Sequence, residues 1–271
     1  MKLSLSQYLQ IVQSQSLSLA HQKKLGRTWD ARIESPLAFV PTKVVEGGIT
    51  AVSAIRANQE LGEFAQNFLK KILNNFSEGD LERRQQKAGK VIAVGCGRGY
   101  DLHWVEQAVR ANLRTIWLDV SEVACQMAAI DLNRQFEQIK NSMNQSYLRP
   151  LVMKAEIRSA LVDPESIGLD LGSVEIWYMC RVLGCLSARS REIVLRRLGR
   201  SLAADGSSIV IVGALRDDNE QYTGSKNSDL LSLKYIQSNL ERGAKMDVSV
   251  VDRASCQYFG KFVTALYIRT K

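Results

Sequence analysis

The stretch GKVIAVGCGRGYDLHW, residues 89–104, decides the fold. Its apolar run VIAV is rich in β-branched residues, which is typical of a buried strand. Three alternate glycines follow at Gly95, Gly97 and Gly99, and a helical pattern begins shortly after them. Glycines between a strand and a helix let the backbone approach a ligand closely, and the N-terminus of the helix offers free N–H groups. The stretch therefore predicts a ligand-binding turn.

The spacing of the glycines excludes two common types of ligand-binding turn. A dinucleotide-binding G-x-G-x-x-G/A pattern needs a small third residue, but Tyr100 or Leu102 stands there, depending on the starting glycine. The phosphate-binding pattern G-x-x-x-x-G-K-[ST] is absent. A nicotinamide-dependent oxidoreductase is therefore the least favoured class of enzyme.

From residue 90 onward the sequence alternates between strand and helix patterns. Strands are predicted at 90–95, 114–119, 149–155, 173–179 and 207–213, with helices near 101–111, 122–140, 159–167 and 188–204. Such alternation predicts parallel strands joined by crossover helices. Two further strands, 246–252 and 261–269, are separated by only eight residues, 253–260. A parallel crossover takes about a dozen or more residues, so the last of the seven strands is expected to run antiparallel.

The first part of the chain has a different, helical pattern. Apolar residues share a helix face at Leu5, Tyr8, Leu9 and Val12, and again at Leu61, Phe64, Phe68 and Ile72. Between these patterns, residues 26–48 contain Pro36, Pro41 and the pair Gly47-Gly48, and are predicted to be irregular. We expect a helical part, residues 1–87, and an α/β part, residues 88–271.

The composition is that of a globular protein that can bury a full core, with 271 residues of which 45% are hydrophobic. No apolar run approaches the roughly 20 residues that span a bilayer, and Gln and Ser interrupt the N-terminus where a secretory signal would be apolar. We therefore expect a cytoplasmic protein without a membrane partner. The five cysteines are widely spaced and only two histidines accompany them, so neither a disulfide framework nor a metal site is expected.

The formal charge of +8 raises the question of an anionic partner such as nucleic acid. The densest basic groups are Arg83-Arg84 with Lys87 and Lys90, and Arg196-Arg197 with Arg200. Neither group contains the interleaved aromatic residues of a base-stacking surface. A solvated helix surface is the simpler interpretation, and nucleic acid binding is possible but not favoured.

Two motifs of the α/β part resemble those of the class I S-adenosylmethionine-dependent methyltransferases. VIAVGCGRG is similar to the first motif of that family, and TIWLDVS supplies Asp119, 20 residues after Gly99. The resemblance covers roughly residues 88–271 and implies a Rossmann-like, mostly parallel sheet of seven strands with an antiparallel last strand, covered by an N-terminal helical cap. One departure is that Ala93 or Val94 stands where the family usually has an acidic residue.

The resemblance implies how S-adenosylmethionine would be bound. Gly95, Cys96, Gly97 and Gly99 would surround its methionine part. Asp119, followed by Val120, would bind the ribose hydroxyls, and Glu156 and Ile157 would contact the adenine. Met179 and Cys180, in the segment WYMCRVLGCL, would lie near the methyl group. Two alternatives stay open: Asp119 could cap the next helix together with Ser121, and Glu156 could be a turn residue.

The segment after the fourth strand limits the classes of molecule that could accept the methyl group. Met179-Cys180-Arg181-Val182 differs from the Asn/Asp-Pro-Pro-aromatic motif of amino-group methylases and from the Pro-Cys of cytosine-carbon methylases. This favours a small-molecule acceptor, with residues 1–87 resembling a lid and residues 214–245 forming a second wall. Candidate substrate contacts are Tyr8, Trp29, Tyr178 and Tyr222, with Arg181 to bind an anionic group, while His103 and Tyr178 are weak candidates for catalysis.

Methyl transfer from a sulfonium depends mainly on positioning and a dry pocket, so a catalytic base is needed only for some acceptors. Two alternatives stay open beside a small-molecule methyltransferase. One is an RNA or protein methyltransferase that recruits its substrate through the basic surface. The other is a non-methylating protein that uses the same pocket for binding or for another reaction. The acceptor atom and the oligomeric state are left open.

Overall fold

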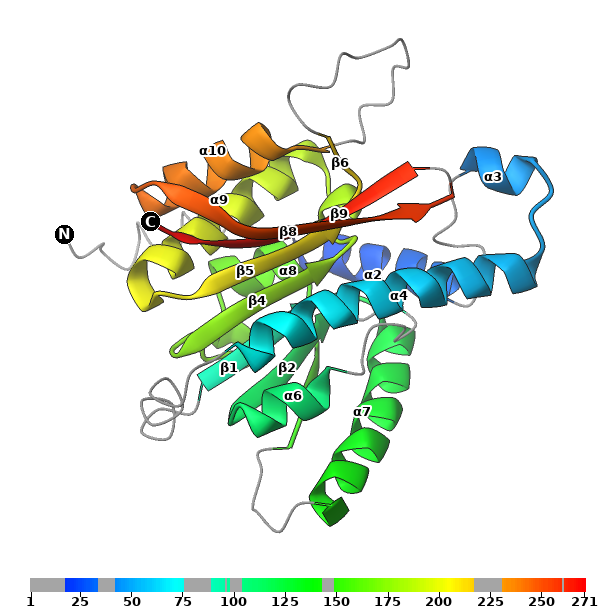
Figure 1. Cartoon of the computed structure of the whole chain (residues 1–271), viewed down its shortest axis with the longest axis horizontal. Helices are drawn as coiled ribbons and strands as arrows, with labels where there is room; N and C mark the ends of the chain where they lie inside the picture. The colour runs from blue at the N-terminus through cyan, green and yellow to red at the C-terminus, as the bar shows by residue number, and fades with distance from the viewer. Residues whose placement is uncertain are drawn as a thin grey trace.

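A seven-stranded sheet forms the centre of the computed structural model, which describes residues 18–33, 42–75, 89–95, 97, 104–142, 149–216, 231–259 and 261–271 (Figure 1). The strands are β1 (Gly89–Val94), β2 (Leu113–Asp119), β3 (Leu151–Lys154), β4 (Val174–Cys180), β5 (Ser208–Gly213), β8 (Val248–Tyr258) and β9 (Lys261–Thr270). Their order across the sheet is β3-β2-β1-β4-β5-β9-β8. Each of the seven predicted strands is therefore present.

The strand directions confirm the predicted reversal at the end of the chain. β1 pairs in parallel with β2 and β4, β2 with β3, and β4 with β5. β9 is antiparallel to both of its neighbours, β5 and β8, so it alone of these seven strands runs in the opposite direction. The loop predicted at 253–260 was wrong, because β8 continues to Tyr258. Its side chains at Arg253, Ser255 and Gln257 are exposed on an edge strand, which made the segment look like a loop in the sequence.

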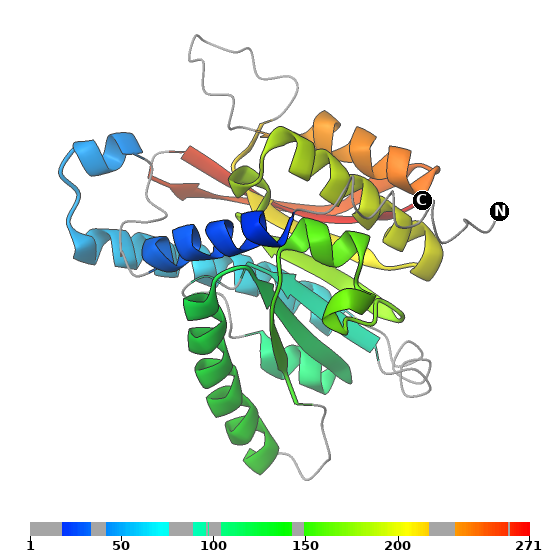
Figure 2. The same ribbon diagram turned by 180° about the vertical axis from the view of Figure 1, so that it is seen from behind.

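Helices cover both faces of the sheet. One face carries α4 (Ala51–Asn74), α6 (Val105–Arg110) and α7 (Glu122–Ser142), seen in Figure 1, and the other carries α8 (Ile157–Val162), α9 (Ala188–Asp205) and α10 (Leu233–Ala244), seen in Figure 2. Successive side chains of a strand alternate between these faces. In β1, Val91 and Ala93 join one core cluster, whereas Ile92 joins the other. Burial on both faces explains the continuous apolar runs of the strands.

The N-terminal helices pack onto this sheet. The predicted inward face of α4 is confirmed, since Leu61, Phe68 and Ile72 are buried in the same core cluster as β1 and Phe64 packs against that cluster. The side chain of Thr50 caps α4 by accepting a hydrogen bond from the backbone N–H of Ser53, 3.2 Å away. The domain boundary predicted between residues 87 and 88 lies outside the described residues.

The irregular structure predicted for residues 26–48 was wrong in two places. The helix α2 (Leu19–Ile33) includes residues 26–33, and α3 (Thr42–Glu46) is a short helix. Leu25, Trp29 and Ile33 follow one another at four-residue spacing, which is an apolar stripe of a helix. The nearby prolines and glycines are typical of irregular structure and outweighed this stripe in the prediction, although Pro36 lies beyond the end of α2.

The segment 214–245 has more structure than the sequence predicted. It contains a short parallel pair, β6 (Leu215–Arg216) and β7 (Leu231–Ser232), and the helix α10. Leu215, Leu231 and Leu233 pack against the core on the α9 side of the sheet. Short helical turns also occur at η1 (Glu165–Ile167) and η2 (Leu183–Cys185). None of the helices in the described ranges combines the length and the apolar character that crossing a membrane requires.

Candidate functional site

A cavity opens at the carboxyl ends of the central strands, where ligands bind in open α/β sheets. The strand ends and the loops after them line it with Val94, Gly95, Gly97, Leu118, Asp119, Val120, Ala155, Glu156, Ile157, Cys180, Arg181, Val182, Cys185 and Leu186. The N-terminal helices line it with Leu25, Trp29 and Ile33 from α2 and Asn58, Leu61 and Gly62 from α4. The fold thus brings most of the described predicted site residues to one place.

The turn after β1 has a backbone shape that requires glycine. Gly95 and Gly97 have φ values of +75° and +50°, in the left-handed region that favours glycine. The N–H of Gly95 donates to the carbonyl of Leu118, 2.7 Å away, which ties the turn to β2. A Cβ at position 95 would lie 2.6 Å from Cγ2 of Val182. A side chain at Gly95 would therefore be both strained and crowded.

Asp119, at the end of β2, holds this turn in place. The residue is 9% exposed, and Oδ2 of its carboxylate accepts a hydrogen bond from the N–H of Gly97, 3.1 Å away. The other oxygen, Oδ1, accepts from the N–H of Ser121 at 2.8 Å. The cap of α7 is Ser121 itself, whose Oγ accepts from the N–H of Ala124 at 3.0 Å. Asp119 also lies on the cavity wall, and a carboxylate is a suitable acceptor for hydroxyl groups of a ligand.

Glu156 lines the cavity after β3 and also caps the next helix. Its side chain is buried, and Oε1 accepts from the N–H of Arg158 at 3.0 Å. Oε2 accepts from the N–H of Ser159 at 2.8 Å and from its hydroxyl at 2.9 Å. Its local role is to cap α8, whereas the alternative left open from the sequence was an exposed turn residue. This cap coexists with a position on the cavity wall, next to the buried side chain of Ile157.

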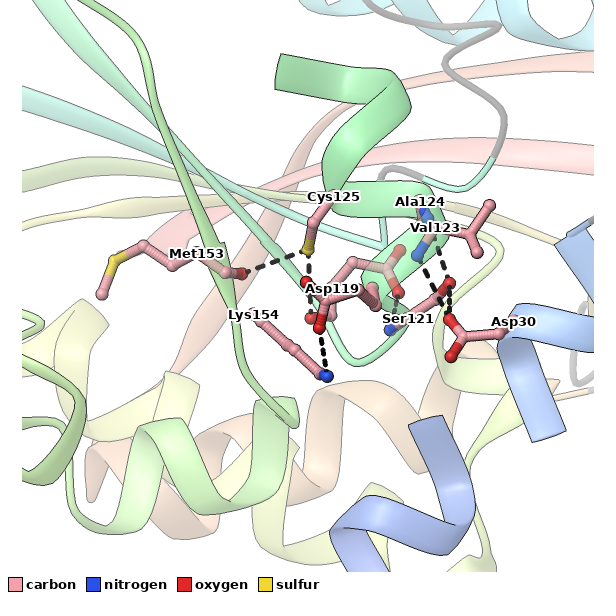
Figure 3. A network of polar contacts seen from close by, with 9 residues as sticks. Asp30, Asp119, Ser121, Val123, Ala124, Cys125, Met153 and Lys154 are labelled. Carbon is pink, nitrogen blue, oxygen red and sulfur yellow. Dashed lines mark hydrogen bonds and ion pairs between the residues drawn. The ribbon is translucent and has the colours of Figure 1, made fainter. Parts of the chain in front are cut away.

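The helix α2 is joined to the loop after Asp119 by the carboxylate of Asp30 (Figure 3). The hydroxyl of Ser121 donates to Oδ1 of Asp30 at 2.7 Å, and the N–H of Val123 donates to the same atom at 3.2 Å. A Cβ on Gly26 would lie only 2.9 Å from the carbonyl oxygen of Val120, so α2 approaches this loop very closely.

The electrostatics of Asp30 follow from these contacts. Burial raises the pKa of its carboxyl, but the hydrogen bonds from Ser121 and from backbone N–H groups at the start of α7, together with the charge of Lys154, outweigh burial. The net result is a pKa below the ordinary value, so the carboxylate form is favoured. Lys154 also forms an ion pair with Glu122, the first residue of α7.

Arg181, directly after β4, is held by groups from three other elements, β5, α4 and β8. Its φ is +60°, and its N–H donates to the carbonyl of Val212 at 2.7 Å. Its Nη1 donates to Oδ1 of Asn58 and to the hydroxyl oxygen of Tyr258, both at 3.1 Å. The hydroxyl of Tyr258 in turn donates to Oδ1 of Asn58 at 2.8 Å. The guanidinium carbon lies 4.8 Å from the centre of the Tyr258 ring.

The other predicted site residues are placed as follows. Trp29 lines the cavity, as predicted for a substrate contact. Tyr178 is buried against the Trp104 ring, with 5.8 Å between ring centres, and Met179 is buried in the core on the α9 side. Neither of these two is among the residues that line the cavity. Tyr8, Cys96, Gly99, His103 and Tyr222 lie outside the described residues.

Several cavity residues were missed by the sequence analysis. Leu25 and Ile33 could have been found from their four-residue spacing around Trp29. Asn58 and its partner Tyr258 carried no local signal, because their contact joins residues 200 positions apart.

In the second candidate wall, residues 214–245, the described residues do not line the cavity. The described chain holds no group of three His, Cys, Asp or Glu residues that could bind a metal ion.

The strand order, the reversed β9 and the site at the ends of β1 and β2 define the class I S-adenosylmethionine-dependent methyltransferase fold. The structure of the CurJ carbon methyltransferase aligns with 95% of this chain and 72% of its own, with a TM-score of 0.54 and 13% identity. The [4+2]-cyclase SpnF aligns over 92% of this chain and 96% of its own, with a TM-score of 0.50 and 11% identity. At such identities the likeness shows the fold alone.

A methyltransferase from Aquifex aeolicus that depends on S-adenosylmethionine is a looser match. It covers 70% of this chain and 88% of its own, with a TM-score of 0.44 and 19% identity. No protein-family model and no curated protein sequence matches the chain.

Proposed function

We propose that the protein is a methyltransferase that uses S-adenosylmethionine to methylate a small molecule. The observation that carries the proposal is the hydrogen bond from the N–H of Gly97 to the carboxylate of Asp119, on the wall of a cavity that extends to α2 and α4. When bound, the cofactor supplies a methyl group activated on a positively charged sulfur. Residues of the chain would bind the cofactor, position the acceptor and exclude water.

The residues of the cavity fit the parts of this cofactor. Asp119 would accept hydrogen bonds from the two ribose hydroxyls, because its carboxylate lies on the cavity wall and offers two acceptor oxygens. Glu156 would accept one from the adenine amino group, and Val120 and Ile157 supply apolar surface for the ring. The turn at Gly95 would face the amino acid part. Two carboxylates on the wall also suit a ligand that carries positive charge.

A small acceptor is favoured by the helices that close the cavity. Trp29, Leu25 and Leu61 cover it with apolar side chains, which would exclude water and hold the acceptor in line with the methyl group. A groove for a nucleic acid strand would instead be lined by basic and aromatic side chains. The cytoplasmic location and the absence of a nucleic acid partner stay predictions.

Calorimetric titration with S-adenosylhomocysteine and with NADH tests the cofactor. We expect S-adenosylhomocysteine to bind and NADH not to bind. Asp119→Asn keeps the shape of the side chain but removes its charge, and should weaken the affinity by about tenfold or more, as expected for loss of a charged hydrogen-bond acceptor. Asp131→Asn, on the exposed side of α7, is the matched control. Binding of NADH alone, or equal affinity in wild type and Asp119→Asn, would reject the proposal.

Methyl transfer itself needs a separate assay, because the same fold occurs in a protein named as a [4+2]-cyclase. A metabolite extract, total RNA and total protein are each incubated with the enzyme and methyl-labelled cofactor. Label in the metabolite fraction is the expected result. Label in RNA or protein would instead support an enzyme that acts on macromolecules. Binding of S-adenosylhomocysteine without transfer to any fraction would favour a non-methylating function.

A further inference from the structure

We propose that the end of the cavity beside β4 is an apolar subsite, and that the methyl acceptor is a hydrophobic molecule whose aromatic or alkyl body fills it. The proposal rests on the proposed function and specifies its substrate class. We call this part of the wall the acceptor end. It consists of Ile33, Leu61, Gly62, Val182 and Leu186, all of which line the cavity.

The acceptor end and the two carboxylates lie on opposite sides of the glycine turn. Glu156 follows β3 and Asp119 ends β2, whereas Val182 comes two residues after β4, and β1 lies between β2 and β4 in the sheet. Val182 borders the turn itself, since a Cβ on Gly95 would lie 2.6 Å from its Cγ2. A cofactor whose nucleoside part binds the carboxylates therefore leaves the β4 side of the cavity for the acceptor.

The helix α4 reaches the same end of the cavity. Oδ1 of Asn58, on α4, accepts a hydrogen bond from Nη1 of Arg181 at 3.1 Å, which joins α4 to the residues that follow β4. Leu61 and Gly62 lie one helical turn further along α4 and also line the cavity. Ile33, from α2, belongs to the same core cluster as Leu61. Three segments far apart in the chain thus form one wall.

This wall is apolar and fixed by the packing around it. Ile33 and Leu61 are only 2% and 4% exposed and belong to the core cluster on the α4 side of the sheet. Val182 and Leu186 pack against the core cluster on the α9 side. Gly62 is buried and adds no side chain that would fill the space. The acceptor end therefore offers a ligand a preformed hydrocarbon surface, which favours ligands that bury apolar area.

The polar side chains next to this wall bind one another. Of the described residues that α4 contributes to the cavity, only Asn58 has a polar side chain. Its amide donates to the carbonyl of Ala54 at 2.9 Å, and its Oδ1 accepts from Tyr258 at 2.8 Å as well as from Arg181. These hydrogen bonds are formed within the protein, so they do not require a polar group on the ligand.

The test is calorimetry on the full-length protein saturated with S-adenosylhomocysteine, with phenol, 4-ethylphenol and 4-propylphenol as probes. The affinity should rise about fourfold for each added methylene, the usual effect of burying one such group. The analogue 4-(2-hydroxyethyl)phenol has the length of 4-propylphenol but ends in a hydroxyl group. It should bind about tenfold more weakly than 4-propylphenol, because the acceptor end would have to desolvate the hydroxyl.

A substitution on the wall separates this subsite from general attraction of apolar molecules to the protein. Leu61→Asn nearly keeps the size of the side chain but makes it polar, and should remove most of the preference for 4-propylphenol over its hydroxyl analogue. Val52→Asn, at a position of the same helix that is 77% exposed, is the matched control and should keep the preference. Leu186→Asn, on the opposite and less buried part of the wall, gives the same test if Leu61→Asn does not fold.

The possible results distinguish this inference from the proposed function. The inference is overturned if none of the phenols binds, if the affinity does not rise with the alkyl chain, or if the hydroxyl analogue binds as tightly as 4-propylphenol. It is also overturned if the preference survives substitution of the wall. Each of these results leaves the cofactor assignment intact, whereas failure of S-adenosylhomocysteine to bind the wild-type protein would reject the proposed function.

Discussion

The hydroxyl of Ser121 and the carboxylate of Asp30 form a hydrogen bond of 2.7 Å between residues 91 positions apart. Ser121 lies directly before α7 and its N–H donates to the carboxylate of Asp119, whereas Asp30 belongs to α2. The residue that we assign to the cofactor ribose and the helix that covers the cavity are therefore joined through one serine. We therefore expect the position of α2 and the position of Asp119 on the cavity wall to depend on each other.

Replacing Asp30 tests this connection. Asp30→Ala removes the acceptor for Ser121 and for the N–H of Val123, and should lower the free energy of unfolding by about 1 kcal/mol, the usual cost of a lost helix cap. The affinity for S-adenosylhomocysteine should fall as well, because α2 loses a contact with the loop after Asp119. Urea unfolding and calorimetry measure the two effects, with Asp131→Ala as the control. Wild-type values for both quantities would contradict the connection.

The same carboxylate should make stability depend on pH. The pKa of Asp30 is lowered in the folded protein, so its contribution is present above the ordinary carboxyl value of about 3.9 and is lost as the pH falls through the lower, folded-state pKa. The difference in unfolding free energy between wild type and Asp30→Asn should therefore be constant from about pH 7 to 5 and shrink below about pH 4. Urea unfolding at each pH checks this, and a difference that grows on acidification would exclude the assigned direction.

Glu156 should set the preference for adenine. A carboxylate accepts a hydrogen bond from an amino group but not from the carbonyl oxygen of hypoxanthine. Wild type should bind S-adenosylhomocysteine about tenfold more tightly than S-inosylhomocysteine. Glu156→Gln keeps an acceptor for the cap of α8 and should lose most of this preference. Competition calorimetry measures the ratio, and an equal ratio in both proteins would leave Glu156 with its capping role alone.

The contact between α9 and α10 should tolerate no side chain at Gly199. A Cβ there would lie 2.1 Å from the carbonyl oxygen of Leu240, on the backbone of the facing helix. Gly199→Ala should therefore destabilise the protein by about 3 kcal/mol, since the two helices must separate. Gly184→Ala is the control, because nothing lies within 4 Å of its added Cβ. Thermal unfolding compares the two, and equal midpoints would mean that the helices can shift apart without cost.

Local pattern was enough to predict the sheet. Continuous apolar runs and the alternation with helices depend on neighbouring residues, and the seven strands and the reversal of the last one were confirmed. The end of β8 was misread because an edge strand carries polar side chains at Arg253 and Gln257. The helix α2 was missed because turn-forming residues nearby outweighed the spacing of Leu25, Trp29 and Ile33.

The candidate site also contains features that could be predicted from the sequence and features that could not. The glycine turn and Asp119 follow directly from short motifs, since a turn of this shape needs glycines and the strand after it ends in the only carboxylate of its segment, TIWLDVS. The contact of Arg181 with Asn58 and Tyr258 could not be predicted, because it depends on how α4 packs against β8 at the edge of the sheet. No local pattern specifies such packing.

The sequence by itself determined the succession of strands and helices, the reversal of the last strand and the place where a ligand meets the backbone. Hydrophobic period, glycine conformation and loop length act over a few residues. Tertiary structure alone decided what covers that place and with which charges. Asn58 reaches the cavity, Tyr258 reaches Arg181 and Asp30 reaches Ser121 only through packing between segments far apart in the chain. There, side-chain contacts rather than local conformational preferences set the positions.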